Sequence, residues 1–132
     1  RAQHVSEVIL PALRKGDWVL SDRFSGSTFA YQGFGRNLNL EIIEQLEKIA
    51  TQDITPDISI LLDISVKESL RRRRKYINDR IEEEGEGFLE KVSLGFRSLA
   101  QKRNWITITA NNDPQFISME IQKSIYKYLQ DI

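Results

Sequence analysis

Residues 58–64 read Ile-Ser-Ile-Leu-Leu-Asp-Ile, a nearly continuous apolar run that contains one carboxylate, Asp63. Such a run is typical of a strand buried on both faces, and strands of this kind belong to parallel sheets. Two shorter runs, 18–20 and 105–109, consist largely of apolar and β-branched residues and predict two further strands. The chain is therefore expected to fold around a parallel sheet.

Segments with helical spacing separate the predicted strands. Apolar side chains recur every three or four residues within 5–13, 42–50, 88–99 and 117–129. The capping box Ser65-Val66-Lys67-Glu68 opens another helix, whereas residues 23–39, rich in glycine, serine and asparagine, predict a loop with at most one helical turn. The alternation predicts one α/β domain over residues 1–132, with a parallel sheet covered by helices on both faces.

The composition restricts the possible classes of protein. The 132 residues fit one domain, and 19 basic and 19 acidic side chains give no net charge, which excludes a globally basic nucleic-acid binder. The lack of cysteine excludes disulfides and thiolate chemistry, and the single histidine, His4, excludes histidine-cluster metal sites. The apolar runs are too short to span a membrane and no signal peptide is visible, so we expect a cytoplasmic protein.

The candidate site lies at the end of the first predicted strand. Ligands of open parallel sheets bind beyond the carboxyl ends of the strands, and Asp22 and Arg23 lie there, followed by a glycine-containing loop. An arginine can donate two parallel hydrogen bonds to a phosphate, each contributing about 1.5–3 kcal/mol. The alternative is a surface Asp–Arg pair, which contributes little.

An ordered series of motifs starts at this point. The series is Asp22-Arg23-Phe24, Ser27-Thr28, Ala30-Tyr31-Gln32-Gly33 and Gly35-Arg36, and an arginine-rich stretch further on ends in Asp79-Arg80-Ile81-Glu82. With these motifs, essentially the whole chain resembles the bacterial thymidylate kinases. The resemblance implies the P-loop NTPase-like fold of the nucleoside monophosphate kinases, phosphoryl transfer from ATP to dTMP with Mg²⁺ as cofactor, and a homodimer.

The resemblance also implies roles for single residues. Arg23 matches the arginine that holds the phosphate of the nucleoside monophosphate, and Arg1 matches one that hydrogen-bonds the thymine carbonyl. Asp22 either helps to organise magnesium-bound water or orients Arg23, and the sequence leaves both roles open.

Four further residues match positions around the rest of the nucleotide. Ser27 and Thr28 match positions beside the thymine and the nearby backbone. Tyr31 matches the aromatic residue that lies against the deoxyribose and disfavours a 2′-hydroxyl, and Gln32 matches a monophosphate-site position. Together with the two arginines, they form the dTMP site that the resemblance implies.

The basic run Arg71–Lys75 allows three interpretations. It can be the solvated end of a helix, where positive charge suits the helix dipole. It can be a nucleic-acid patch, but acidic residues follow it with few interleaved aromatics, so nucleic acid is not expected as a partner. By resemblance it begins a kinase lid over 71–87, in which Arg72, Arg74 and Arg80 best match the arginines that stabilise the charge of phosphoryl transfer.

The glycine-rich loop G-x-x-x-x-G-K-[ST], which such a kinase needs for the donor phosphates, does not occur in this sequence. The chain begins with Arg1 and its only methionine is Met119. We therefore expect a preceding segment, and the resemblance implies that this segment carries the loop and supplies a strand between 18–21 and 58–64, without which the fold is incomplete. Residues 1–132 alone are expected neither to bind ATP productively nor to catalyse.

Two other functions remain as alternatives. One is a related deoxynucleoside or nucleotide kinase with the same phosphate chemistry and a different base. The other is a non-catalytic module that binds nucleic acid or a partner through the basic run described above.

Overall fold

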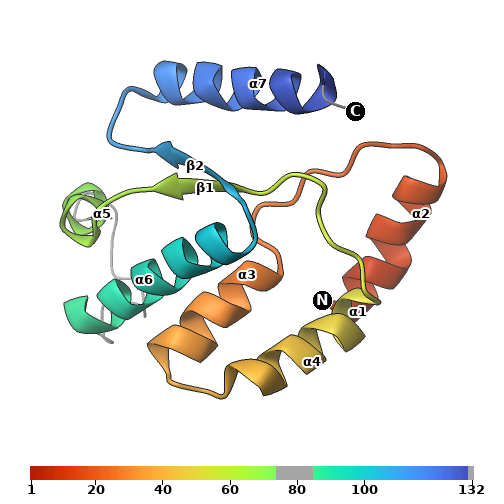
Figure 1. The fold of residues 1–132 in the computed structure, drawn as a ribbon, viewed down its shortest axis with the longest axis horizontal. Coiled ribbons are helices and arrows are strands. Elements are labelled where there is room, and N and C mark those ends of the chain that lie inside the picture. The colour runs from red at the N-terminus through yellow and green to blue at the C-terminus, as the bar shows by residue number, and fades with distance from the viewer. Residues whose placement is uncertain (74–84, 131–132) are drawn as a thin grey trace.

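The computed structural model describes residues 1–73 and 85–130, whose arrangement is shown in Figure 1. The helical segments are α1 (Ala2–His4), η1 (Val5–Ile9), α2 (Leu10–Arg14), α3 (Ser25–Thr28), η2 (Phe29–Gly35), α4 (Leu40–Thr51), α5 (Val66–Arg73), α6 (Glu86–Lys102) and α7 (Pro114–Gln130). The strands are β1 (Ile60–Asp63) and β2 (Ile106–Thr109). The segments η1 and η2 have the wider π-helical turn and directly continue their neighbouring α-helices, so that α3 and η2 form one helix.

The two strands form a parallel sheet in the middle of the molecule. Ile60 pairs with Ile106, and Asp63 pairs with Thr109. In Figure 1, α7 lies on one side of the strands, whereas α6 and the α3–η2 helix lie on the other, and α7 contacts β2 while α6 contacts β1. The prediction of an α/β fold with a parallel sheet and helices on both faces is confirmed.

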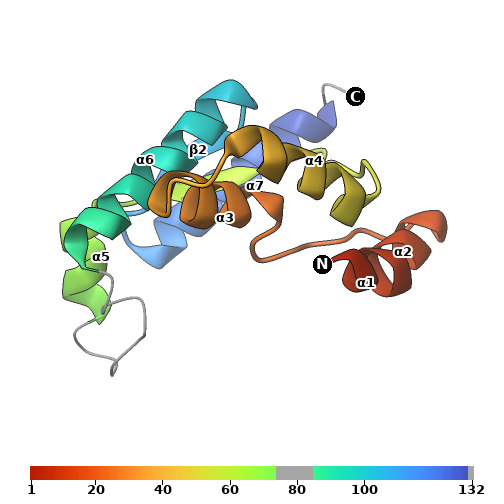
Figure 2. The same cartoon turned by 90° about the horizontal axis from the view of Figure 1, so that it is seen from below.

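Different helices form the two ends of the molecule. Figures 1 and 2 both place α5 at one end and α1 and α2 at the other, near α4. Gln52 Nε2 donates a hydrogen bond to Ser6 Oγ over 2.7 Å and so links the end of α4 to η1. Within 1–73 and 85–130, no helix combines the length and apolar character that crossing a lipid bilayer requires.

The centre of the core lies between the α3–η2 helix, α4 and α6. Phe29, Ile43 and Leu99 are buried together there, and Trp105 packs against them. Burying a side chain of this size contributes about 1.5–3 kcal/mol. The core therefore fixes the α3–η2 helix, which carries most of the candidate site.

Side-chain caps set the starts of three helices. Asn39 Oδ1 and Asp113 Oδ1 each accept a backbone N–H of α4 and α7, respectively, over 2.8 Å. Ser65 Oγ accepts the Glu68 N–H over 3.2 Å, which confirms Ser65 as the cap of α5 and one half of the predicted capping box, whereas the Glu68 carboxylate binds Arg71 and Arg72. Each cap of this kind contributes about 1 kcal/mol.

The prediction of a strand at 18–20 is wrong for the described structure. This segment is irregular, with Trp18 76% exposed and Leu20 100% exposed. A strand needs a neighbour for its backbone hydrogen bonds, and within the described part of the chain the sheet consists of β1 and β2. Apolar character without a pairing partner does not make a strand.

The prediction of a loop at 23–39 is also wrong, because residues 25–35 form the α3–η2 helix. Glycines in this segment suggested a loop, but they allow close packing instead. A Cβ atom at Gly35 would come within 2.5 Å of the Phe88 ring of α6. Tertiary contact therefore outweighs the low helix propensity of glycine here.

Strand β1 is shorter and less buried than the run 58–64 suggests. It covers Ile60–Asp63, and Leu62 is 47% exposed. The expected burial on both faces is therefore wrong for the described residues, because a two-stranded sheet offers covering helices little surface to bury.

Candidate functional site

Arg23 lies two residues before Ser25, where the α3–η2 helix begins, and its backbone conformation is strained. Its φ is +65°, in the left-handed region that costs a residue other than glycine about 1–2 kcal/mol. Ser21 Oγ donates a hydrogen bond to the Arg23 carbonyl over 2.9 Å. The Arg23 guanidinium lies 5.6 Å from the centre of the Tyr31 ring. Strain that the surroundings maintain in this way is characteristic of functional positions.

Arg1, the first residue of the chain, also contacts this segment. Its Nη2 donates a hydrogen bond to the Phe24 carbonyl over 3.3 Å, and its guanidinium lies 5.8 Å from the centre of the Phe24 ring. The structure thus brings Arg1 to the residue that follows Arg23. Two guanidinium groups at the start of one helix can attract an anion.

Tyr31 is held in place by helix α6. Its ring centre lies 6.2 Å from that of Phe88 and 6.1 Å from that of Phe96, in tilted and edge-on geometries. Such aromatic pairs contribute about 0.5–1.5 kcal/mol beyond their burial. The ring that meets Arg23 is therefore fixed in position between Arg23 and two aromatic rings of α6.

The remaining predicted dTMP residues lie along the same segment. Ser27 and Thr28 belong to α3 and Gln32 belongs to η2, and all three are half-buried. Asp22 is exposed and directly precedes Arg23. The sequence positions of these residues place them beside Arg23 and Tyr31, on one continuous helix and the turn before it.

A charged pair that the sequence analysis missed lies behind this helix. Arg103 donates two hydrogen bonds to the carboxylate of Glu47, over 3.0 and 2.8 Å, and its guanidinium lies 4.6 Å from the centre of the Phe29 ring. Burial raises the pKa of Glu47, but hydrogen bonds from Arg103 and from the buried Ser25 outweigh it and hold the pKa below its usual value. No local motif could reveal a pair whose members are 56 residues apart.

The described parts of the predicted lid are the end of α5, at residues 71–73, and residues 85–87, where α6 begins. Arg71 Nε and Arg72 Nε bind opposite oxygens of Glu68, over 2.6 and 2.9 Å. These hydrogen bonds, from Arg71 first and then Arg72, lower the pKa of Glu68 to about 2. Arg74 and Arg80 lie outside the described residues, as does most of the segment 71–87.

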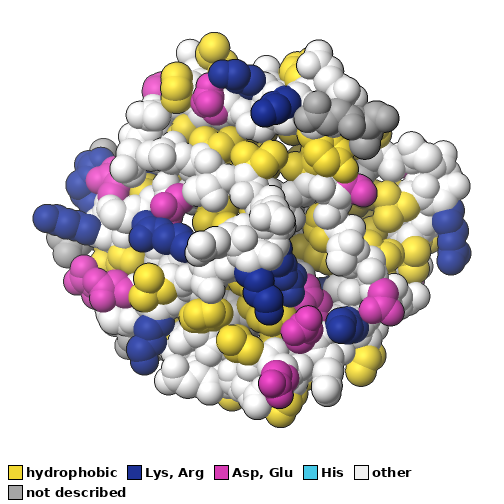
Figure 3. All heavy atoms as spheres, viewed as in Figure 1, with side chains coloured by type: hydrophobic (Ala, Val, Ile, Leu, Met, Phe, Trp, Pro, Cys, Tyr) yellow, Lys and Arg dark blue, Asp and Glu magenta, His cyan; other side chains and the backbone are white. Residues whose placement is uncertain are grey.

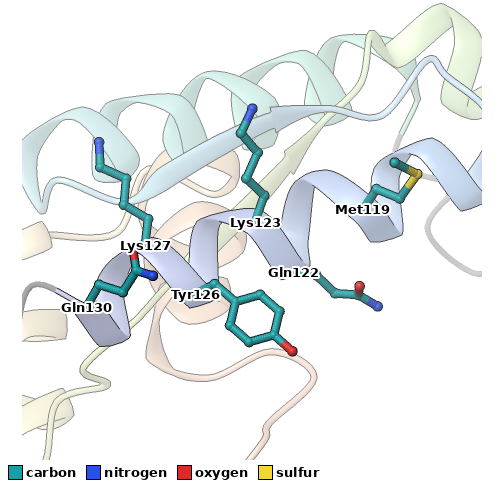
Figure 4. A pocket seen from close by; sticks show the side chains of 6 residues that line it. All are labelled: Met119, Gln122, Lys123, Tyr126, Lys127 and Gln130. Atoms are coloured by element: carbon teal, nitrogen blue, oxygen red, sulfur yellow. The ribbon is translucent and has the colours of Figure 1, made fainter.

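One face of the molecule mixes the different kinds of side chain. Figure 3 shows hydrophobic, basic and acidic side chains scattered over the face it displays. A surface hollow on α7 contains none of the predicted site residues; it is lined by Met119, Gln122, Lys123, Tyr126, Lys127 and Gln130 (Figure 4). Within the described residues, no group of three or more His, Asp or Glu side chains could hold a metal ion.

The fold and the site together define an α/β protein with two arginines at the start of one helix and a tyrosine further along it, an arrangement suited to a phosphate-bearing ligand. A family model described as thymidylate kinase matches residues 1–121, and the chain belongs to the thymidylate kinase family. The family has the P-loop NTPase fold, and the small parallel sheet is consistent with an incomplete form of it. The resemblance inferred from the sequence is confirmed.

Curated relatives agree with the family model. A protein named thymidylate kinase from Prochlorococcus marinus (strain SARG) is 54% identical over 132 residues, which are 100% of this chain and 60% of the relative. Its namesake from strain NATL2A is 53% identical over 99% of this chain and 62% of the relative. One from Parasynechococcus marenigrum (strain WH8102) is 50% identical over 95% of this chain and 60% of the relative. The chain thus spans about 60% of the length of these relatives.

Proposed function

We propose that this chain carries the dTMP-binding part of a thymidylate kinase, which transfers the γ-phosphoryl group of ATP to dTMP. The observation that carries the proposal is the strained Arg23, whose guanidinium lies over the fixed Tyr31 ring, beside the Phe24 that Arg1 contacts. The names of the relatives support it. We further propose a cytoplasmic homodimer.

Each residue of the site has a role in this proposal. Arg23 binds the dTMP phosphate, Arg1 donates to a thymine carbonyl, and the ring of Tyr31 lies against the deoxyribose. A 2′-hydroxyl on that sugar would have to displace a ring that Phe88 and Phe96 hold in place. Rigid placement of the acceptor is how an enzyme without a covalent intermediate accelerates phosphoryl transfer.

Three half-buried polar residues complete the proposed site. Ser27 and Thr28 offer hydroxyl groups toward the thymine and the nearby backbone, and Gln32 offers an amide to the monophosphate. Ser27 precedes Tyr31 by four positions, as Thr28 precedes Gln32, which is the spacing of neighbours on a helix surface.

Magnesium would enter the proposed site with ATP. Mg²⁺ is usually held by one or two carboxylates together with substrate phosphates and water. The exposed Asp22, directly before Arg23, fits this requirement as a carboxylate that reaches the ion through water, or it orients Arg23. The bound ion neutralises charge on the transferring phosphoryl group.

Arg72 is the described member of the proposed lid, and Arg74 and Arg80 are its other members. An arginine that closes over the donor can accelerate phosphoryl transfer by about 10³–10⁵. Arg72 is paired with Glu68 in this structure, so we propose that it exchanges this partner for phosphate when ATP binds.

The donor loop lies, in this proposal, within the part of the relatives that the chain does not cover. Residues 1–132 alone would then neither bind ATP productively nor phosphorylate dTMP. An assay of dTMP phosphorylation by these residues alone tests this. The positive control is a longer version of the protein that has the full length of the relatives. Turnover by residues 1–132 would contradict it.

The role of Arg23 is tested by dTMP binding in a form of the full length of the relatives. Arg23→Ala should weaken dTMP binding by about ten- to a hundredfold, the loss expected from one or two charge-assisted hydrogen bonds. Thymidine, which has no phosphate, should bind both forms equally. Arg14→Ala, at an exposed arginine on α2, is the control; unchanged dTMP affinity in the Arg23 variant would refute the proposal.

The two alternative functions have their own tests. Competition among dTMP, dUMP, dCMP and thymidine separates a thymidylate kinase from a related nucleotide kinase. A binding module that uses the basic run should show steep salt dependence on DNA without nucleotide binding. The pairing of Arg71 and Arg72 with Glu68 disfavours this module, because it neutralises part of the charge.

A further inference from the structure

The turn between α6 and β2 lies behind the start of the α3–η2 helix. In this turn, Asn104 has a φ of +53°. The Arg103 N–H donates to the Leu99 carbonyl and the Trp105 N–H to the Ala100 carbonyl, each over 2.8 Å. The turn is thus tied to the end of α6 on both sides of Asn104, and the side chains of Arg103 and Trp105 leave it from fixed positions.

The first of these side chains contacts the α3–η2 helix at Phe29 and is held there by Glu47. The planar fork of Arg103 matches the carboxylate of Glu47 with two hydrogen bonds, and its guanidinium lies 4.6 Å from the centre of the Phe29 ring. Glu47 is 13% exposed and Arg103 is 30% exposed. Because Phe29 is buried and follows Ser25, the first residue of α3, by one helical turn, this pair constrains the first turn of the helix.

The second side chain touches the backbone of the next residue. The Trp105 ring lies so close to Gly26 that a Cβ atom at Gly26 would collide with it. Trp105 also packs against the core formed by Phe29, Ile43 and Leu99. The start of the helix is therefore held by the Arg103 guanidinium at Phe29 and by the Trp105 ring at Gly26, both from one turn.

The strained conformation of Arg23 needs such support. Strained backbone persists where the surrounding structure over-determines it, and Arg23 is two residues before Ser25. Before Arg23 in the sequence, Ser21 holds the segment by donating a hydrogen bond to the Arg23 carbonyl. After Arg23, the contacts of Trp105 at Gly26 and of Arg103 at Phe29 do so.

We propose that Arg103, Glu47 and Trp105 are positioning residues, which hold the start of the α3–η2 helix so that Arg23 presents its guanidinium to the phosphate of the acceptor nucleotide. The inference rests on the proposed function, because it concerns how the same site binds its phosphate. It adds three residues, distant in the sequence, that do not touch the ligand.

A double-mutant cycle in a form with the full length of the relatives tests the polar contact. Arg103→Ala should raise the Kd for dTMP by about tenfold or more, because displacing a binding group by about an ångström can cost a hundredfold. It should leave the Kd for ATP unchanged, and Arg103→Lys should restore part of the loss. In an Arg23→Ala background, Arg103→Ala should have no further effect, since it acts through Arg23.

The apolar contact supplies a second test that does not depend on the ion pair. Gly26→Ala should raise the Kd for dTMP, and the added change Trp105→Phe should reverse part of this rise, because the smaller ring leaves room for the methyl group. Arg97→Ala, which removes another ion pair of α6, is the control and should leave dTMP binding unchanged. Thermal unfolding checks that each variant is folded at the assay temperature.

The outcomes separate the inference from the function on which it rests. If Arg23→Ala does not weaken dTMP binding, the proposed function fails. If Arg23→Ala weakens it but the folded Arg103 and Gly26 variants bind dTMP normally, the inference alone fails. Additive losses for Arg23→Ala and Arg103→Ala would also overturn it.

Discussion

Among single residues, Glu47 shows how the fold depends on one carboxylate. Its pKa is lower in the folded chain than the usual 4.5, so the folded state binds the proton less readily than the unfolded state. The stabilisation is therefore complete above about pH 4.5 and is lost as the pH falls through the folded pKa. The same carboxylate ties α4 to Arg103 at the end of α6, and Arg103 in turn contacts Phe29, so its charge matters for the site as well as for stability.

Glu47→Gln should lower the free energy of unfolding at pH 7 by about 1.5–3 kcal/mol, the contribution of hydrogen bonds to a charged group. The difference from the unmodified chain should be smaller at pH 3 than at pH 7, because the stabilisation decreases as the pH falls below 4.5 toward the lowered pKa of the folded state. Urea unfolding at both pH values measures this. A difference of equal size at both would show that the charge of Glu47 does not stabilise the fold.

Glu68 is a second carboxylate with a lowered pKa, but it lies on a helix surface and binds two arginines, Arg71 and Arg72. Its pKa of about 2 results from hydrogen bonds with Arg71 first and then Arg72. Arg71→Ala should raise the midpoint of the Glu68 titration toward the usual 4.5, as measured by carboxyl ¹³C NMR, with Glu68→Gln to assign the signal. A midpoint that stays near 2 would mean that Arg71 is not the main partner.

Helix α6 contains two glycines, Gly87 and Gly95, whose surroundings differ. A Cβ atom at Gly95 would come within 2.8 Å of the Phe34 side chain, whereas one at Gly87 would meet nothing within 4 Å. The first allows the α3–η2 helix to approach α6, and the second only weakens its helix. Substitutions at Gly95 and Gly87 can therefore distinguish the effect of packing on stability from the effect of helix propensity.

Gly95→Ala should destabilise the chain by about 1–3 kcal/mol through overpacking, although alanine favours a helix by about 1 kcal/mol. Gly87→Ala, the matched control, should be neutral or stabilising by up to about 1 kcal/mol. Thermal or urea unfolding of both variants gives the comparison. Equal effects at the two positions would show that the contact with Phe34 does not constrain α6.

The elements that could be predicted are those whose signals are local. The helix cap at Ser65 and the apolar periodicity of the long helices can be recognised from residues that are close together in the sequence. The strand expected at 18–20 and the helix at 25–35 depend instead on partners far away in the sequence. The same holds for the site: an ordered motif identified Arg23 and Tyr31, whereas nothing local marks the pair of Glu47 with Arg103.

Across the whole molecule, apolar side chains and sheet edges are left uncovered in the described structure. Leu20 is fully exposed, Leu62 is about half exposed, and the sheet has two strands. Exposed apolar residues beside open sheet edges favour association between chains. The 132 residues by themselves should therefore associate as their concentration rises.

Leu20→Lys should reduce this association with little effect on the unfolding temperature, because the side chain has no buried contacts to lose. Sedimentation velocity over a range of concentrations measures the association. Gln101→Lys, at an exposed position of α6, controls for added charge alone. Association that is reduced equally by both changes would assign it to net charge rather than to the apolar side chain.

The contact between Trp105 and Gly26 also provides an optical reporter. The chain has two tryptophans, and Trp18 is largely in solvent whereas Trp105 lies against the start of the α3–η2 helix. Trp18→Phe would leave a protein with one fluorophore at this junction. Its emission would then follow, in real time and without an added label, any movement of that helix start as a nucleotide enters or leaves.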